Sequence, residues 1–131
     1  MSCRCRNLVF GCPRNRNMPE GADPQQGEDF LSRIAWMAAQ RQVVIGLEAN
    51  PPVYNTNYIN TTADAFAMAK KLDSPGLGVT LDVGTMIANG ERPNDFAADM
   101  KYVSMCTSAS RALPPSKSGR FTGSWRCCWA R

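Results

Sequence analysis

The chain has 131 residues and a formal net charge of +4. That length allows a single domain with a buried core. The charge is unevenly divided, because residues 1–104 carry ten Lys and Arg against eleven Asp and Glu, whereas residues 105–131 carry five against none. Few aromatic side chains accompany the basic residues of the tail, so nucleic acid is not expected as a partner.

The six cysteines form no C-x-x-C pair, and the chain has no histidine. A disulfide framework or a structural zinc site is therefore not expected, and reduced thiols in the cytoplasm are the default. No apolar run is long enough to cross a membrane, and the amino-terminal residues MSCRCRN lack the apolar core of a signal peptide. We therefore expect a cytoplasmic protein without a membrane partner.

Three short, nearly continuous apolar runs occupy residues 7–11, 43–49 and 77–83. Such runs are typical of parallel strands covered on both faces, so all three are expected to be interior strands. They begin roughly 35 residues apart, which fits one strand, one crossover helix and two loops. Repeated units of this kind form either an open doubly wound sheet or a barrel.

Helical spacing of apolar residues predicts a helix within residues 24–42 and another within residues 60–76. The second has an N-cap candidate among residues 60–62 and ends at Ser-Pro-Gly. A shorter helix at residues 94–101 leads into a fourth strand that begins near Tyr102. No dinucleotide-binding or Walker motif accompanies these elements, so the sequence does not support a nucleotide site.

Two acids end successive predicted strands, Glu48 in IGLEAN and Asp82 in TLDVGT, and each is expected to be followed by a loop. The carboxyl ends of parallel strands line the active sites of such folds, so both carboxylates are expected at one opening. Neighbouring strands lie about 4.8 Å apart, which lets two carboxylates reach one divalent ion. The alternative is that each acid caps a helix or pairs with an arginine.

Polar side chains also follow the first two predicted strands. Arg14 and Arg16 could grip a phosphate, a carboxylate or sugar hydroxyls, or could instead pair in a solvated loop with an acid such as Glu20. Asn50 belongs to an Asn-rich loop, NPPVYNTNYIN, that suits a polyhydroxylated ligand and is equally common in rigid turns.

The segments LVFGCPRNRNMPEG and VVIGLEANPPVYNTNYINTTADAFAMAKKLDSPGLGVTLDVGTMIANGE resemble the xylose isomerase-like barrel superfamily of sugar and sugar-phosphate isomerases and epimerases. The resemblance implies a partial (β/α)8 TIM barrel over residues 1–104. It also implies a divalent metal ion (Mn²⁺, Mg²⁺, Co²⁺ or Zn²⁺) held by Glu48 and Asp82. The family's other ligands, a histidine and a second glutamate, have no counterpart here. Thr85 stands where many relatives carry a histidine, at a position of substrate contact.

The tail, residues 105–131, departs from this pattern and is expected to be aberrant and disordered. A shift of the reading frame by one base after Ser104 would explain it. In the shifted frame, each new codon joins the last base of one codon to the first two bases of the next. The codon formed from those of Met105 and Cys106 must then encode valine, and the codon formed from those of Cys106 and Thr107 can encode only histidine or tyrosine. With permitted codons SMCTSASRAL becomes SHVHISEPGL, which restores a histidine-bearing strand.

These observations predict a fragment of a metal-dependent sugar or sugar-phosphate isomerase or epimerase. By resemblance it would act by proton transfer through an enediolate, with Glu48 as acid and base. As written, the chain is expected to be inactive, to hold metal weakly and to self-associate through open sheet edges. The alternatives are a non-catalytic fragment, a metal hydrolase like the apurinic endonucleases, and a basic binding module.

Overall fold

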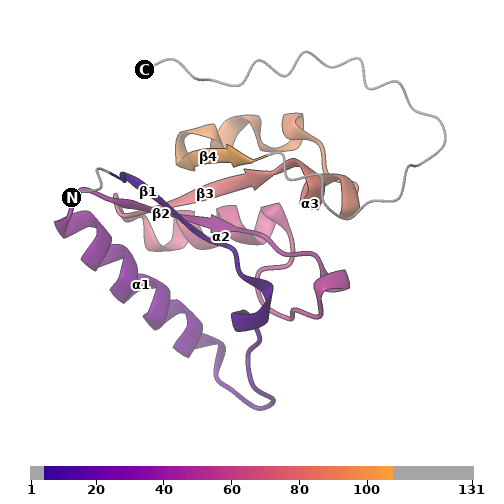
Figure 1. The fold of residues 1–131 in the computed structure, drawn as a ribbon, viewed down its shortest axis with the longest axis horizontal. Helices are drawn as coiled ribbons and strands as arrows, with labels where there is room; N and C mark the ends of the chain where they lie inside the picture. Colours follow the sequence, from indigo (N-terminus) through magenta and orange to yellow (C-terminus); the bar gives the residue numbers. More distant parts are fainter. Residues whose placement is uncertain (1–4, 108–131) are drawn as a thin grey trace.

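The computed structural model describes residues 5–107, and the rest of the tail lies outside the described residues. A single parallel sheet holds four strands in chain order, with helices in the connections between them (Figure 1). This is a partial (β/α)8 barrel, as the sequence predicted. The strands are β1 Asn7–Phe10, β2 Val44–Glu48, β3 Leu77–Asp82 and β4 Val103–Thr107.

Two long helices form the first two crossovers. Helix α1, Pro24–Gln40, begins at Asp23, whose side chain accepts a hydrogen bond from a backbone N–H of the first turn. Helix α2, Thr62–Leu72, begins at Thr61, which forms a capping box with Asp64. The structure thereby selects one of the three N-cap candidates that the sequence offered.

The third connection differs from the prediction. Helix α3, Val83–Ala88, follows β3 without a loop, because Asp82 caps it directly. The short α-helix predicted at residues 94–101 is instead a 3-10 helix, Pro93–Tyr102, which begins with a proline. Two brief 3-10 turns, Pro13–Asn15 and Pro52–Tyr54, lie in the loops after β1 and β2.

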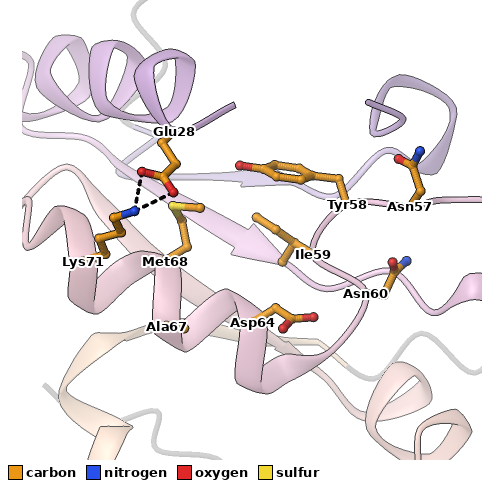
Figure 2. Close-up of a pocket in the computed structure, with 9 residues that line it drawn as sticks. All are labelled: Glu28, Asn57, Tyr58, Ile59, Asn60, Asp64, Ala67, Met68 and Lys71. Atoms are coloured by element: carbon orange, nitrogen blue, oxygen red, sulfur yellow. Dashed lines mark hydrogen bonds and ion pairs between the residues drawn. The ribbon is translucent and has the colours of Figure 1, made fainter. Parts of the chain in front are cut away.

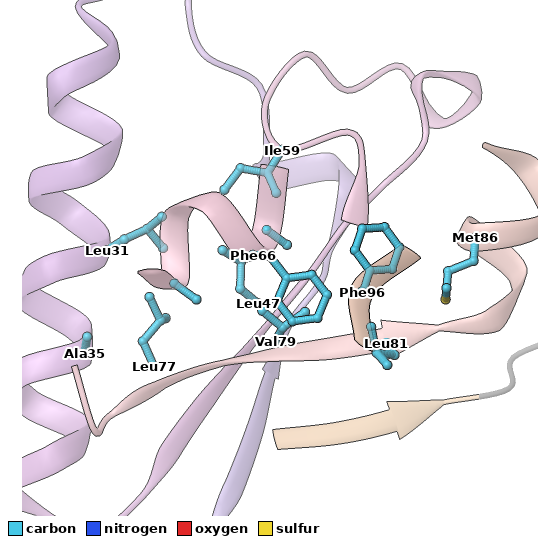
Figure 3. Packing of buried hydrophobic residues seen from close by; sticks show 12 residues of the cluster. Leu31, Ala35, Leu47, Ile59, Phe66, Leu77, Val79, Leu81, Met86 and Phe96 are labelled. Carbon is cyan, nitrogen blue, oxygen red and sulfur yellow. The ribbon is translucent and has the colours of Figure 1, made fainter. Parts of the chain in front are cut away.

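The hydrophobic core lies between the helices and one face of the sheet (Figure 3). Leu47 and Val79 of the two central strands are fully buried, and they meet side chains of α1 and α2. Phe66 of α2 stacks on Phe96 of the 3-10 helix with ring centroids 5.2 Å apart. This packing fixes the helices to β2 and β3, the strands that carry the two predicted acids.

The other face of the sheet carries small side chains. Gly46 lies so close to the next strand that an added Cβ would meet the Thr80 hydroxyl at 2.2 Å. Because successive strand residues point to opposite faces, Glu48 shares this face with Gly46, and Asp82 shares it with Thr80. Both acids therefore lie on the face away from the helices, which would be the interior of a complete barrel.

Two expectations about the strands need correction. Strand β1 is an edge strand in the described sheet, and its Leu8 and Val9 are 51% and 44% exposed. Leu8 and Val9 point to opposite faces, so β1 is not covered on either face, and within residues 5–107 no strand pairs with its outer edge. Regular structure also continues past Ser104, since β4 pairs with β3 as far as Thr107.

No helix among the described residues is long and apolar enough to cross a membrane.

Candidate functional site

Glu48 and Asp82 lie at the carboxyl ends of the neighbouring strands β2 and β3. The register pairs Glu48 with Thr80, so Asp82 is two residues further along the next strand. Oε1 of Glu48 and Oδ1 of Asp82 each lie 3.4 Å from the hydroxyl oxygen of Thr107 in β4. The two carboxylates therefore face one point and lie close enough to interact electrostatically.

The position of Glu48 depends on a glycine in the adjacent strand end. A Cβ at Gly11 would lie 1.7 Å from Oε2 of Glu48, so the carboxylate occupies the space that any other residue would fill. Burial raises the pKa of Glu48, and the charge of Asp82 raises that pKa further. The Thr107 hydrogen bond and the charge of Arg16 act in the opposite direction on the same pKa.

Asp82 is held by the residue that the sequence suggested as a substrate contact. The backbone N–H and the hydroxyl of Thr85 each lie 2.9 Å from Oδ2 of Asp82. The same hydroxyl is 3.2 Å from the carbonyl oxygen of Ala49, and Thr85 is buried. Thr85 is thus engaged in positioning Asp82 and the end of β2, and only Oδ1 of Asp82 is left to face Thr107. The alternative considered from sequence, that each acid caps a helix, is thus correct for Oδ2 of Asp82, which caps α3. Oδ1 of Asp82 takes no part in the cap.

The two arginines of the first loop have different environments. Arg14 is exposed and has no hydrogen bond or ion pair within the described residues. Arg16 is only 3% exposed, and its guanidinium donates hydrogen bonds to the carbonyl oxygens of Phe10 and Glu48. Arg16 therefore braces the ends of β1 and β2 and does not form the solvated pair with Glu20 considered from sequence. That Arg16 grips an anion stays a prediction.

Asn50 is buried beside the site and organises the loop after β2. Its carbonyl oxygen accepts hydrogen bonds from the Thr56 hydroxyl at 3.0 Å and from Nδ2 of Asn60 at 2.7 Å. Its backbone N–H donates to Ile59. Nδ2 of Asn50 is buried without a protein partner among the described residues. The main chain of Asn50 thus supports the turn, which agrees with the rigid-turn alternative considered from sequence.

Thr107 is the site residue that sequence reasoning did not identify. Its hydroxyl is the point on which both carboxylates converge. The register of β4 against β3 pairs Thr107 with Asp82 across a bulge, and no motif in the sequence marks that bulge. The signal that could have found it is the expected shift of reading frame, because the strand read in the other frame would carry a histidine at this position.

The site offers oxygen ligands of the kind that hard divalent cations prefer. Two carboxylates and one hydroxyl face one another, and the mutual repulsion that raises the Glu48 pKa would be relieved by a cation between them. Within residues 5–107 no group of three or more His, Cys, Asp or Glu side chains could hold a metal ion. These donors fit a loosely bound ion that keeps several waters.

A cavity larger than one that lies beside β1 is found between α1 and α2 on the outer side of the sheet (Figure 2). Its volume is about 410 Å³, and the ion pair between Lys71 and Glu28, with Nζ 2.6 Å from Oε2, closes one end. Neither Glu48 nor Asp82 lines it. This cavity is therefore separate from the paired acids.

No protein-family model and no curated protein matches the chain. Three solved structures share its fold. A xylose isomerase-like TIM barrel/4-hydroxyphenylpyruvate dioxygenase fusion protein is 25% identical over 64% of this chain, with a TM-score of 0.53. A xylose isomerase domain protein from Alicyclobacillus acidocaldarius is 20% identical over 77% of the chain, with a TM-score of 0.57. The apo form of 3-keto-D-glucoside 4-epimerase from E. coli is 18% identical over 88%, with a TM-score of 0.59.

The chain spans 13%, 38% and 48% of the lengths of these three proteins. The match therefore concerns part of a barrel in each case. Parallel strand order, crossover helices and these similarities agree with the resemblance found in the sequence. The described part of the chain thus has the fold of a partial barrel like that of xylose isomerase-like TIM barrel proteins.

Proposed function

We propose that the chain is part of a sugar or sugar-phosphate isomerase or epimerase that depends on a divalent metal ion. The observation that carries this proposal is the convergence of Glu48 and Asp82 on one hydroxyl at the carboxyl end of the sheet. Two of the structural neighbours carry the names of a xylose isomerase domain and a sugar epimerase, which supports a carbohydrate as the class of substrate.

Glu48 and Asp82 would hold the metal ion, with waters at the remaining positions. Such an ion, when bound, would polarise the carbonyl and the adjacent hydroxyl of a sugar. Thr85 would keep one oxygen of Asp82 occupied and so fix the direction in which the other points. Gly11 would leave room for the Glu48 carboxylate beside the end of β1.

Glu48 is the candidate for proton transfer. Burial and the charge of Asp82 raise its pKa, which brings this carboxylate closer to the range in which it can both accept and return a proton. In the proposed reaction Glu48 would take a proton from the carbon next to the substrate carbonyl, and an enediolate would remain. Return of the proton to the other carbon, together with transfer of the hydroxyl proton to the original carbonyl oxygen, would give the isomer. Epimerisation would need a second acid on the opposite face of the enediolate, the place of the family's second glutamate, which has no counterpart in this chain.

Thr107 explains why this chain would be inactive as written. The restored reading frame places a histidine at this position, where its imidazole would face both carboxylates, whereas a threonine offers only a neutral hydroxyl. A hydroxyl is a weaker ligand than an imidazole for Mn²⁺, Co²⁺ or Zn²⁺. We therefore expect weak metal binding and no turnover by the 131-residue chain.

The test compares this chain with a version in which the base is restored after the Ser104 codon and the remaining strands of a xylose isomerase-like barrel are supplied. Both are assayed with Mn²⁺ on a panel of ketoses and ketose phosphates. We expect activity only in the completed barrel, and loss of that activity in its Glu48→Gln variant. Turnover by the 131-residue chain that Glu48→Gln leaves unchanged would overturn the proposal.

A further inference from the structure

A second, smaller cavity lies on the outer side of β1, away from the paired acids. Its volume is about 200 Å³, and it is bounded by the end of β1, the loop that follows it, the first turns of α1 and Tyr58. Glu48, Asp82 and Thr107 do not line it. Its lining includes Phe10, Arg16, Gly27, Phe30, Leu31 and Tyr58.

Arg16 gives this cavity a positive charge. Its guanidinium lies 5.1 Å from the centroid of the Phe10 ring, and Glu48 meets it electrostatically only from beyond ion-pair distance. The side chain is 3% exposed, and two of its nitrogens donate to main-chain carbonyl oxygens, while Nε is buried without a partner. No carboxylate of the described residues lies within ion-pair distance of its guanidinium; the ion pairs found there join Lys70 to Asp99 and Lys71 to Glu28. A buried cation is costly unless an anion accompanies it.

Tyr58 adds a second unsatisfied donor. Its hydroxyl is buried without a hydrogen-bond partner, and it lies against α1 where Gly27 leaves space. A Cβ at Gly27 would lie 2.5 Å from this hydroxyl. The Tyr58 side chain reaches toward the helix that carries Glu28 (Figure 2). Because no hydrogen bond holds the Tyr58 hydroxyl, its ring can adjust to an incoming acceptor.

We propose that this cavity binds the carboxylate of a short aliphatic acid, which accepts hydrogen bonds from Nε of Arg16 and from the Tyr58 hydroxyl. One carboxylate has two oxygens for these two donors and one negative charge for the buried guanidinium. The hydrocarbon part then lies against Phe10, Phe30 and Leu31 in the same cavity. Binding would satisfy both orphaned donors together.

Inorganic phosphate fits the same lining less well. It carries more charge and more acceptor oxygens than the two free donors can satisfy, so some oxygens would be desolvated against the aromatic and aliphatic wall. A neutral amide of the same shape would leave the Arg16 charge without a counterion. We therefore expect butyrate to bind more tightly than either phosphate or butyramide.

The experiment uses the full, nitrogen-labelled chain in metal-free buffer, which keeps carboxylates from binding through a metal ion. Each probe is titrated while the Nε–Hε resonance of Arg16 is followed by NMR. We expect butyrate to shift this resonance saturably, with a Kd of about 1 mM for so small a ligand. Butyramide and phosphate should leave it in place.

Matched variants assign the response to the cavity. Tyr58→Phe removes one hydrogen bond to a charged group and should weaken butyrate binding about tenfold. Gly27→Ala should do the same by displacing the Tyr58 hydroxyl. Tyr54→Phe alters an exposed tyrosine that does not line the cavity and should bind like the unmodified chain. The proposal is wrong if butyrate gives no saturable shift, if phosphate or butyramide binds as well, or if Tyr58→Phe binds butyrate normally.

Discussion

Glu48 and Asp82 direct one carboxylate oxygen each at the same hydroxyl, that of Thr107, at a distance of 3.4 Å in both cases. Two like charges that share one neutral neighbour repel each other, and this repulsion contributes to the raised pKa of Glu48.

Replacing Thr107 with histidine should strengthen the binding of Mn²⁺. The new imidazole would lie beside both carboxylates and supply a third protein ligand, so we expect affinity to rise about tenfold or more. Isothermal titration calorimetry measures the change directly. Thr107→Val, which has the threonine shape without the hydroxyl, should bind no better than the unmodified chain. Equal affinities for the histidine and valine variants would contradict the assignment of the site.

Gly11→Ala should displace the Glu48 carboxylate, because the new Cβ would lie 1.7 Å from its Oε2. We expect metal affinity to fall about tenfold, the effect of losing one well-placed ligand contact. Cys12→Ala changes the exposed neighbouring residue and serves as the control. The circular dichroism of both variants should match that of the unmodified chain; unaltered Mn²⁺ affinity in Gly11→Ala would count against the metal role of Glu48.

Thr85→Val removes the hydroxyl that bonds Asp82 and keeps the volume of the side chain. The free energy of unfolding should fall by about 1–2 kcal/mol, because a buried hydrogen bond is lost and its acceptor remains. Urea denaturation followed by circular dichroism provides the measurement. Thr107→Val, whose hydrogen bonds are long, should change the free energy much less. Equal losses in the two variants would remove the special role given to Thr85.

The raised pKa of Glu48 predicts a pH dependence of stability in the absence of metal. Its folded pKa lies above its unfolded value, so its contribution is fully present below the unfolded pKa of about 4.3 and is lost as pH rises through the folded pKa. Glu48→Gln cannot ionise. We therefore expect this variant to gain stability relative to the unmodified chain as the pH rises from about 4 toward 7.

Urea unfolding in the presence of EDTA, repeated at several pH values between about 4 and 7, measures whether Glu48→Gln gains or loses stability relative to the unmodified chain. A difference between the two proteins that is constant with pH, or that favours the unmodified chain at neutral pH, would show that burial and Asp82 do not dominate the environment of Glu48. Saturating Mn²⁺ should reverse the order at neutral pH, because an ion stabilises only the protein that binds it.

Self-association should depend on the edge of β1, which exposes Leu8. A lysine in place of Leu8 puts a charge on this edge and should lower the fraction of oligomer at equal protein concentration. Sedimentation velocity gives the distribution. Val53→Lys introduces the same charge at an apolar residue that is 75% exposed in a loop away from the sheet edge. If both variants reduce association equally, net charge rather than the β1 edge controls it.

The sequence alone determined the elements that depend on local periodicity and on chain order. Continuous apolar runs specified the buried strands β2 and β3, and helical spacing with a capping threonine specified α2. Because parallel strands end at the same edge of a sheet, the positions of Glu48 and Asp82 at two successive strand ends were sufficient to predict that they share one opening.

Tertiary structure decided which groups those acids meet. Thr107 reaches them only through the pairing of β4 with β3 across a bulge, and Arg16 turns inward because carbonyl oxygens from two different strand ends accept its hydrogen bonds. The sequence of strand β1 is typical of an interior strand, yet in the described part of the chain β1 lies at the sheet edge, with exposed side chains. Such relationships join residues far apart in the chain, and no local pattern of side chains encodes them.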